Sequence, residues 1–237
     1  MSEVDYTAML LGATGNVGGQ ILNLLLQRPT CRKLIVVTRR PVAALSNPKV
    51  QPLIVDMDHL EEELTLRATG VDIALAAFGV GRGSAKMAEE EVRRIEITYP
   101  TAFAAAAKAS GARVLAMMTA AGADSGSSIK YARVIGDKEK AAKDLQFDFL
   151  GLYRPGVILG NSNTPSILNL VMPLLDWALP SRYHSIHTNE LARSMVEQSE
   201  RAFGDLARGS GPAAPAVRTL EYEDMKAFFA PGGGDAR

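Results

Sequence analysis

This sequence of 237 residues has one cysteine, three histidines and no net charge, and each of these features narrows the possible functions. The single cysteine, Cys31, excludes an internal disulfide and is compatible with a reducing compartment. The 26 basic and 26 acidic side chains cancel. Because nucleic-acid binding rests mainly on the neutralisation of phosphates, we expect no nucleic-acid partner. The three histidines show no metal-ligand spacing, so no metal is expected either.

Long apolar runs are missing as well. No run reaches the roughly 18 to 20 residues that a membrane-spanning helix requires. Residues 1–5 carry two acids and lack the basic segment with which a signal peptide begins. We therefore expect no membrane association and a cytoplasmic location.

What remains has the composition of an ordinary globular protein, with 47% hydrophobic and 22% charged residues. Short apolar segments alternate with longer segments of helical periodicity, which predicts βαβ units and a parallel sheet. Strands are expected at about residues 7–11, 34–38, 52–55, 72–78, 113–119, 149–153 and 217–220. Helices are expected at about residues 16–27, 88–110, 130–145, 167–179 and 189–202. The second helix should bend near Pro100, and Thr188 should cap the last one.

A glycine-rich turn joins the first expected strand to the first expected helix. Gly12 permits a tight turn, Gly15 lets the backbone approach a pyrophosphate, and Gly18 lets the helix pack closely on the strand. The first N–H groups of the helix would then face the phosphates. The cofactor-binding residues expected here are Gly12, Thr14, Gly15, Asn16, Val17 and Gly18. The alternative is a structural turn that binds nothing.

In this strand–turn–helix context, the glycines predict an α/β fold of the Rossmann type with a doubly wound parallel sheet. Residues 1–237 are expected to form one NAD(P)-binding domain. Its dinucleotide-binding core would cover about residues 1–160, and a small helix-rich C-terminal part would form a lid or substrate region over about residues 161–229. Residues 230–237 are expected to be a flexible tail.

The end of the second expected strand indicates which dinucleotide is bound. A site for NAD has an acid there to bind the ribose hydroxyls, whereas this chain has Thr38-Arg39-Arg40-Pro41. Because arginine side chains suit the 2′-phosphate of NADP, we expect Arg39 and Arg40 to bind NADP (NADPH) in preference to NAD. A solvated basic turn is the alternative interpretation of this pair.

Together with three later segments, these features resemble the atypical short-chain dehydrogenases/reductases, and most of all the Tat-interacting-protein-like oxidoreductases. The three segments are Leu75-Ala76-Ala77-Phe78-Gly79, then Met118-Thr119-Ala120-Ala121-Gly122-Ala123-Asp124 with Tyr131, and finally Arg154-Pro155-Gly156-Val157-Ile158-Leu159-Gly160. They occur in the order of that family and, with the glycine turn, extend over about residues 7–200.

The resemblance implies further cofactor contacts. They are Asp56 beside the adenine, Phe78 and Gly79 along the ribose side, and Pro155, Gly156 and Val157 at the nicotinamide. Each has a simpler alternative, because Asp56 could cap a helix, Phe78 could belong to the core, and Pro155-Gly156 could form a turn.

The resemblance also implies a catalytic set of Ser, Tyr and a Lys four residues after that Tyr. In such a set Tyr is the acid or base, Ser orients the carbonyl oxygen, and Lys lowers the pKa of the Tyr. Here Tyr131 is present as both catalytic and cofactor-binding residue, and Thr119 takes the place of Ser. The position of the Lys, however, is Ile135. Lys138 lies seven residues from Tyr131, roughly 10 Å along a helix axis, which is expected to be too far for the same task.

Without that lysine, alcohol oxidation should suffer most, because it requires the ionised Tyr131. The favoured hypothesis is an NADP-dependent reductase that transfers hydride to an unidentified small carbonyl compound. The alternative is a non-catalytic NADPH-binding regulatory or scaffold protein. A protein partner or a homodimer is compatible with either. A nucleotide-sugar epimerase is disfavoured, because the chain lacks the length of a larger substrate domain.

Overall fold

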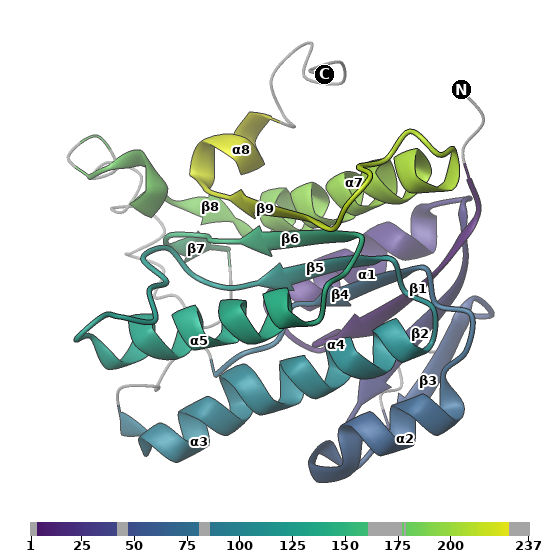
Figure 1. Ribbon diagram of the computed structural model, residues 1–237, viewed down its shortest axis with the longest axis horizontal. Helices are drawn as coiled ribbons and strands as arrows, with labels where there is room; N and C mark the ends of the chain where they lie inside the picture. The colour runs from purple at the N-terminus through teal and green to yellow at the C-terminus, as the bar shows by residue number, and fades with distance from the viewer. Residues whose placement is uncertain (1–3, 42–46, 81–85, 161–176, 178, 228–237) are drawn as a thin grey trace.

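The computed structural model describes residues 4–41, 47–80, 86–160, 177 and 179–227 (Figure 1). Seven parallel strands form one sheet in the order β3-β2-β1-β4-β5-β6-β9. The strands are β1 (Tyr6–Leu11), β2 (Cys31–Thr38), β3 (Val50–Ile54), β4 (Ile73–Ala76), β5 (Val114–Met118), β6 (Phe149–Tyr153) and β9 (Ala216–Leu220). The strand order reverses between β1 and β4, which confirms the Rossmann-type doubly wound sheet.

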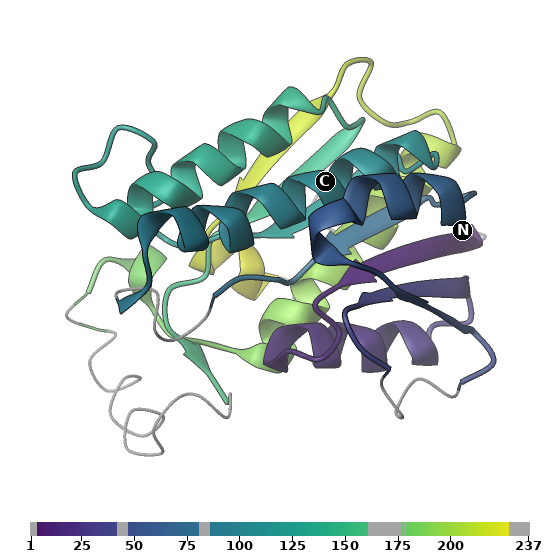
Figure 2. The same cartoon turned by 90° about the horizontal axis from the view of Figure 1, so that it is seen from below.

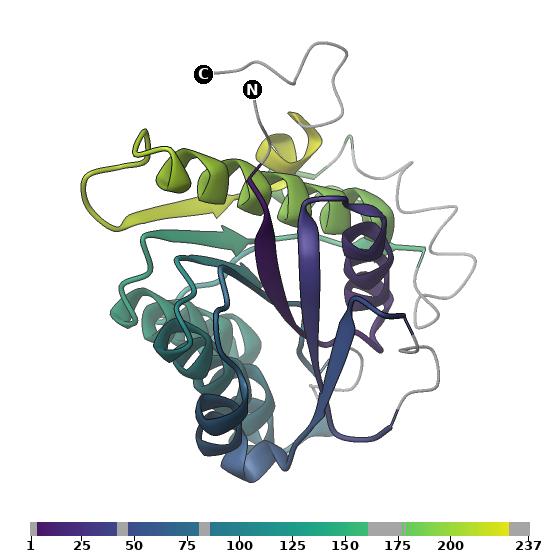
Figure 3. The same cartoon turned by 90° about the vertical axis from the view of Figure 1, so that its right-hand side faces the viewer.

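Helices cover both faces of this sheet, as Figures 2 and 3 show. The main helices are α1 (Asn16–Gln27), α2 (Leu60–Arg67), α3 (Glu89–Arg93), α4 (Tyr99–Ala109), α5 (Lys130–Asp144), α7 (Thr188–Ala207) and α8 (Tyr222–Lys226). Short turns of helix lie at η2 (Met57–His59), η4 (Arg94–Thr98) and η6 (Ser181–Tyr183), and β7 (Ile158–Leu159) pairs with β8 (Ile186–His187).

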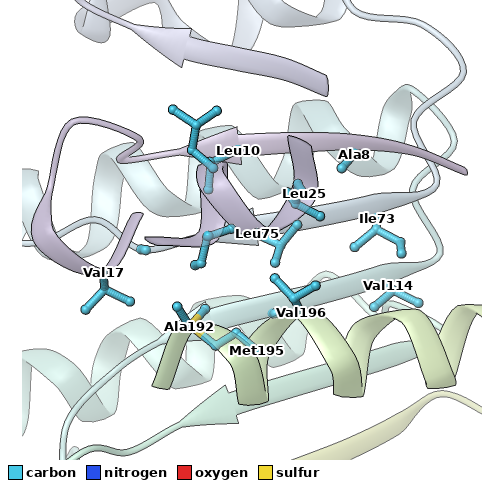
Figure 4. Close-up of a cluster of buried hydrophobic side chains, with 14 of the residues drawn as sticks. Ala8, Leu10, Val17, Leu25, Ile73, Leu75, Val114, Ala192, Met195 and Val196 are labelled. Carbon is cyan, nitrogen blue, oxygen red and sulfur yellow. The ribbon is translucent and has the colours of Figure 1, made fainter. Parts of the chain in front are cut away.

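Each face of the sheet has its own apolar core. On one face, α1 and α7 pack against each other and against β1, β4 and β5. Figure 4 shows this cluster, in which Leu25 of α1 and Val196 of α7 approach Leu75 of β4. On the other face, α2, α4 and α5 pack against the sheet through residues such as Leu64 and Phe103. Burial on both faces explains why the strands are near-continuous apolar runs.

The C-terminal part contributes to the same sheet, with α7 on one face and β9 at the edge beside β6. Two details of the sequence-based prediction are wrong here. His187 is the residue that caps α7, its N–H donating to Glu190 Oε2 at 3.1 Å, and Thr188 is already helical. Helix α2 was not expected, because only Leu60 and Leu64 form its apolar stripe and three consecutive acids separate them.

The long helix expected over residues 88–110 forms from α3, η4 and α4. Its irregularity is the π-helical turn η4, which ends two residues before Pro100 in the first turn of α4. The expected helix over residues 167–179 and the tail over residues 230–237 lie outside the described residues. Among the residues that the structure describes, no helix is long and apolar enough to cross a membrane.

Candidate active site

A cavity of about 610 Å³ opens at the carboxyl ends of β1, β2 and β4. In a doubly wound sheet, this crevice at the reversal of strand order is where ligands bind. Three segments that are distant in sequence meet there, together with Met57 of η2. The lining residues are Leu11, Gly12, Ala13, Thr14, Gly15, Val37, Thr38, Arg39, Arg40, Pro41, Met57, Ala77, Phe78 and Gly79.

The glycine turn has the geometry for which glycine is needed. Gly12 has a φ of 94°, and a Cβ on it would lie 2.3 Å from the carbonyl oxygen of Ala77 at the end of β4. A Cβ on Gly18 would lie 2.0 Å from the carbonyl oxygen of Gly12. Gly15 donates its N–H to that same oxygen at 2.9 Å. The three glycines therefore hold β1, β4 and α1 close together at the floor of the cavity.

The N-terminus of α1 has the features of an anion-binding site. Gly15 is its N-cap residue, with no side-chain hydrogen bond at the cap and no acid in the first helical turn. The positive end of the helix dipole at this N-terminus therefore favours a phosphate. Thr14 is exposed beside Gly15 in the cavity, whereas the side chain of Val17 is buried in the core. Val17 can thus contribute only its backbone to a bound phosphate.

Arg39 and Arg40 follow β2 directly and line the same cavity with exposed side chains. The Thr38 hydroxyl donates to the carbonyl oxygen of Arg40 at 2.9 Å, which shapes the turn. Neither guanidinium forms an ion pair with any residue that the structure describes. Two cations with no ion-pair partner in the described part of the chain, at one end of the cavity, favour a negatively charged ligand group.

Asp56 is a helix cap in this structure. Its carboxylate accepts from the Asp58 N–H at 3.0 Å and contacts His59 Nδ1 at 3.1 Å, closing the start of η2. The backbone hydrogen bond from Asp58 lowers the pKa of the Asp56 carboxyl. Met57, and not Asp56, lines the cavity. The contact of Asp56 with an adenine stays a prediction.

Behind Phe78 and Gly79 lies a buried ion pair that the sequence did not reveal. Glu96 of η4 and Lys138 of α5 are 2% and 1% exposed, and Lys138 Nζ lies 3.1 Å from Glu96 Oε2. Lys138 also donates to the carbonyl oxygen of Phe78 at 3.2 Å. A Cβ on Gly79 would lie 2.7 Å from Glu96 Oε1, so glycine there makes room for the carboxylate. Lys138 thus reaches the cavity wall despite its distance along the helix.

Tyr131 lies in the first turn of α5 and is half-buried. Burial, and after it the charge and hydrogen bonding of the Glu96 carboxylate, raise the pKa of Tyr131 above its usual range. The hydroxyl is therefore protonated at neutral pH. Ile135, in the position of the expected lysine, is buried in the interior. Among the described residues, the charged group that raises the pKa of Tyr131 is thus an acid, Glu96.

Thr119, the expected substitute for serine, is 7% exposed and already engaged. Its hydroxyl lies 2.9 Å from Glu139 Oε1 and 3.0 Å from the carbonyl oxygen of Tyr153. Glu139 in turn accepts two hydrogen bonds from Arg154, at 2.8 and 2.6 Å. An ionised carboxylate and a carbonyl only accept, so the single Thr119 proton is used within this network. Its role in orienting a substrate stays a prediction that requires the hydroxyl to leave Glu139.

The segment Pro155-Gly156-Val157 is tied to its surroundings by the backbone. Ala121 donates to the carbonyl oxygen of Pro155 and Ile186 to that of Val157, both at 2.9 Å. A Cβ on Gly156 would lie 2.6 Å from the backbone of Tyr183. These three residues are outside the lining of the cavity. Their contact with a nicotinamide stays a prediction.

The doubly wound sheet, the glycine turn and the cavity at the strand reversal together define an NAD(P)-binding Rossmann domain. Comparison with known families agrees. Residues 12–150 match the family described as NAD(P)H-binding, and the chain belongs to this family.

Two fungal relatives are similar over the same region. Protein FMP52, mitochondrial, of Candida albicans is 33% identical over 156 residues, which cover 65% of this chain and 68% of that protein. Protein fmp52, mitochondrial, of Aspergillus niger is 33% identical over 155 residues, covering 64% and 66%. Because these relatives are named mitochondrial, the expectation of a cytoplasmic location is wrong by this comparison. That expectation rested only on the lack of a signal-peptide pattern in residues 1–5 and of a long apolar run.

Solved structures share the fold. A short chain dehydrogenase from Burkholderia cenocepacia in complex with NADP has a TM-score of 0.62 and 16% identity, covering 99% of this chain and 95% of that one. A short-chain dehydrogenase/reductase (glucose/ribitol dehydrogenase) from Brucella melitensis has a TM-score of 0.68 and 16% identity, covering 92% and 96%. The fold is therefore that of the short-chain dehydrogenases/reductases, as expected. The narrower resemblance to Tat-interacting-protein-like oxidoreductases is not confirmed by these matches.

Proposed function

We propose that this protein is an NADP-dependent oxidoreductase that reduces a small carbonyl compound. The observation that carries the proposal is the half-buried Tyr131 in the first turn of α5, the helix whose Lys138 donates to the carbonyl oxygen of Phe78 in the wall of the dinucleotide cavity. A general acid must hold its proton at working pH and lie near the cofactor, and Tyr131 meets the first condition by burial and by its acidic neighbour.

Bound NADPH would supply a hydride to the carbonyl carbon. Tyr131 then donates its phenolic proton to the carbonyl oxygen, which yields the alcohol, and the tyrosine regains a proton from solvent. The glycine turn and the N-terminus of α1 hold the pyrophosphate, and Arg39 and Arg40 hold the 2′-phosphate. The chain's own residues therefore supply the binding, the charge complementarity and the proton.

Substituting both arginines tests the choice of cofactor. In Arg39→Ala/Arg40→Ala, NADPH affinity is expected to fall about 10- to 100-fold, because a lost charge-assisted hydrogen bond costs about 1.5–3 kcal/mol and the contributions of two adjacent, exposed arginines are not additive. NADH affinity should change by less than about threefold, since it lacks the 2′-phosphate. Fluorescence titration with both dinucleotides measures the two affinities.

The matched control for this experiment is Arg32→Ala/Arg218→Ala, which removes the same charge at exposed positions outside the cavity. NADPH binding of this variant should equal that of the unaltered protein. Equal weakening of NADPH and NADH by the first variant would refute the assignment of the 2′-phosphate to Arg39 and Arg40.

Removing the Tyr131 hydroxyl tests the chemistry. Tyr131→Phe is expected to lower the rate of carbonyl reduction about 10²- to 10⁴-fold, the usual contribution of a general acid. NADPH affinity should stay within about threefold, because one hydrogen bond at most is lost. The measurement is NADPH oxidation with a panel of small aldehydes and ketones. Unchanged turnover in Tyr131→Phe would remove Tyr131 from the mechanism.

A second candidate is a non-catalytic NADPH-binding protein that acts through a partner protein or a second copy of the chain. Ile135 in the lysine position and the engagement of Thr119 with Glu139 favour it. Such a protein would bind NADPH with the selectivity described above and oxidise it with no member of the carbonyl panel. NADPH binding with turnover would indicate the enzyme, and NADPH binding without turnover would indicate the non-catalytic binding protein.

A further inference from the structure

The cavity wall formed by residues 78–80 is held by two buried side chains. Lys138 Nζ donates to the carbonyl oxygen of Phe78 at 3.2 Å, and the Val80 N–H donates to Glu96 Oε1 at 2.9 Å. The two side chains are also bound to each other, because Lys138 Nζ lies 3.1 Å from Glu96 Oε2. One ion pair therefore bonds both ends of this wall segment.

The opposite side of the same segment faces the ligand cavity. Phe78 and Gly79 line the cavity, and Gly79 is exposed. A Cβ on Gly79 would lie 2.7 and 2.9 Å from the two carboxylate oxygens of Glu96. Glu96 and Lys138 are both buried, so the ion pair contacts the wall from behind and leaves the cavity side of the backbone to a ligand.

Stability alone does not account for this ion pair. Desolvating two charges costs about as much as their attraction returns, so a well-packed apolar pair is often at least as stable. An apolar pair, however, could not donate to the Phe78 carbonyl oxygen or accept the Val80 N–H. What Glu96 and Lys138 add is a fixed backbone conformation beside the cavity.

The backbone that carries Glu96 also departs from regular geometry. Residues Arg94–Thr98 form the π-helical turn η4 between α3 and α4. Such turns occur frequently at functional sites. Helix α5, which carries Lys138, packs against this turn on the same face of the sheet (Figure 1). The turn thus brings the Glu96 carboxylate to the place where α5 meets the cavity wall.

On the basis of the NADPH binding proposed above, we propose that Glu96 and Lys138 are a pair of positioning residues for the dinucleotide. They hold residues 78–80 in the conformation that the adenosine half of NADPH contacts, since the same cavity contains Arg39 and Arg40. The wall is then already ordered when the ligand arrives. Without the pair, part of the binding free energy would be used to order the wall, and the affinity would fall although the protein stays folded.

Two neutral double variants of the full-length protein separate this role from stability. Glu96→Gln/Lys138→Met keeps an acceptor for the Val80 N–H and loses the hydrogen bond to Phe78, whereas Glu96→Leu/Lys138→Met loses both. Neither leaves a buried charge, so both are expected to fold, which circular dichroism checks. Each lost wall bond is expected to weaken NADPH affinity about 2- to 10-fold, the range that the net contribution of one hydrogen bond implies. Calorimetric titration of the folded proteins measures the affinities.

The matched control is Arg93→Met/Asp137→Asn. It removes a partly exposed ion pair that also joins α3 to α5 but makes no hydrogen bond to residues 78–80 in the described part of the chain. NADPH affinity of this variant should equal that of the unaltered protein. An equal loss of affinity in the control would mean that any ion pair between these helices has the same effect, which contradicts a specific role of Glu96 and Lys138.

Competition with adenosine 2′,5′-bisphosphate locates the effect. This compound carries only the adenosine half of the ligand, so its affinity should fall by the same factor as that of NADPH. Unchanged affinity for both ligands in the folded double variants, with only a shifted melting temperature, would show that the pair is merely structural and overturn the proposal. A loss for NADPH alone would place the effect outside this wall and also contradict it. If the unaltered protein binds no NADPH, the proposed cofactor is wrong and this proposal fails with it.

Discussion

Alanine at Gly18 is expected to abolish tight NADPH binding, whereas alanine at the adjacent Gly19 leaves it intact. A Cβ at position 18 would lie 2.0 Å from the carbonyl oxygen of Gly12, so α1 must move away from the glycine turn. The nearest atom to a Cβ at position 19 is 3.6 Å away, an ordinary contact. We expect Gly18→Ala to weaken NADPH affinity on the order of 100-fold, equivalent to about 2.8 kcal/mol.

Stability should separate the two variants in the same way. Gly18→Ala is expected to lower the free energy of unfolding by about 1–3 kcal/mol, as overpacking of a tight contact does. Gly19→Ala should raise it by up to about 1 kcal/mol, because alanine is the better helix former inside α1. Urea unfolding and NADPH titration of both proteins provide the measurements. Similar behaviour of the two variants would show that the close approach at Gly18 is not essential.

Breaking the buried ion pair should have the largest effect on stability. Lys138→Met leaves the Glu96 carboxylate buried with no cation, which is expected to cost about 3–5 kcal/mol of unfolding free energy. Glu96→Gln/Lys138→Met removes both charges and keeps an acceptor for the Val80 N–H. It should therefore recover most of the loss, to within about 1–2 kcal/mol of the unaltered protein.

The matched control for Lys138→Met is Arg93→Met. Arg93 pairs with Asp137 between the same helices, but the two side chains are 43% and 29% exposed. Water already solvates this pair, so its loss should cost about 0–1 kcal/mol. Equal destabilisation by Lys138→Met and Arg93→Met in chemical unfolding would mean that the Glu96 charge finds solvent or another partner.

The sequence was sufficient for the parts of the site that depend on local patterns. A strand, three glycines at fixed spacing and a helix can form only a few geometries, and Gly12 and Gly18 occupy the tight positions that this pattern predicts. Arg39 and Arg40 were found for the same reason, because the end of the second strand has a fixed place in the fold. Local patterns in the sequence were thus enough to predict that the glycine turn and the two arginines meet at this cavity.

Glu96 was missed because its role depends on contacts between distant segments. One signal was present, since Val92, Glu96, Pro100 and Phe103 follow helical spacing and all are buried. A carboxylate on an apolar stripe requires a buried partner, and Lys138 stands on the corresponding stripe of α5 between Val134 and Ala142. The prediction that Lys138 lies too far from Tyr131 to replace the missing lysine stays a prediction, since the partners of Lys138 are Glu96 and the carbonyl oxygen of Phe78.

For Asp56 and Thr119, the sequence pattern predicted a role in the site that the contacts of these side chains do not show. Both stand where the family pattern predicts a functional side chain, yet Asp56 caps η2 and Thr119 binds Glu139. Local hydrogen-bond partners such as an N–H two residues ahead compete for short polar side chains. A position in a motif therefore does not fix what such a side chain contacts.

The most direct test of the dinucleotide site is a titration of the unaltered protein with NADPH, followed by competition with adenosine 2′,5′-bisphosphate. This competitor carries only the adenosine half and the 2′-phosphate, which is the part expected beside Arg39 and Arg40. We predict saturable binding of one NADPH per chain, displaced by the bisphosphate and far less well by AMP. The absence of saturable NADPH binding, or displacement by neither nucleotide, would contradict the assignment of this cavity.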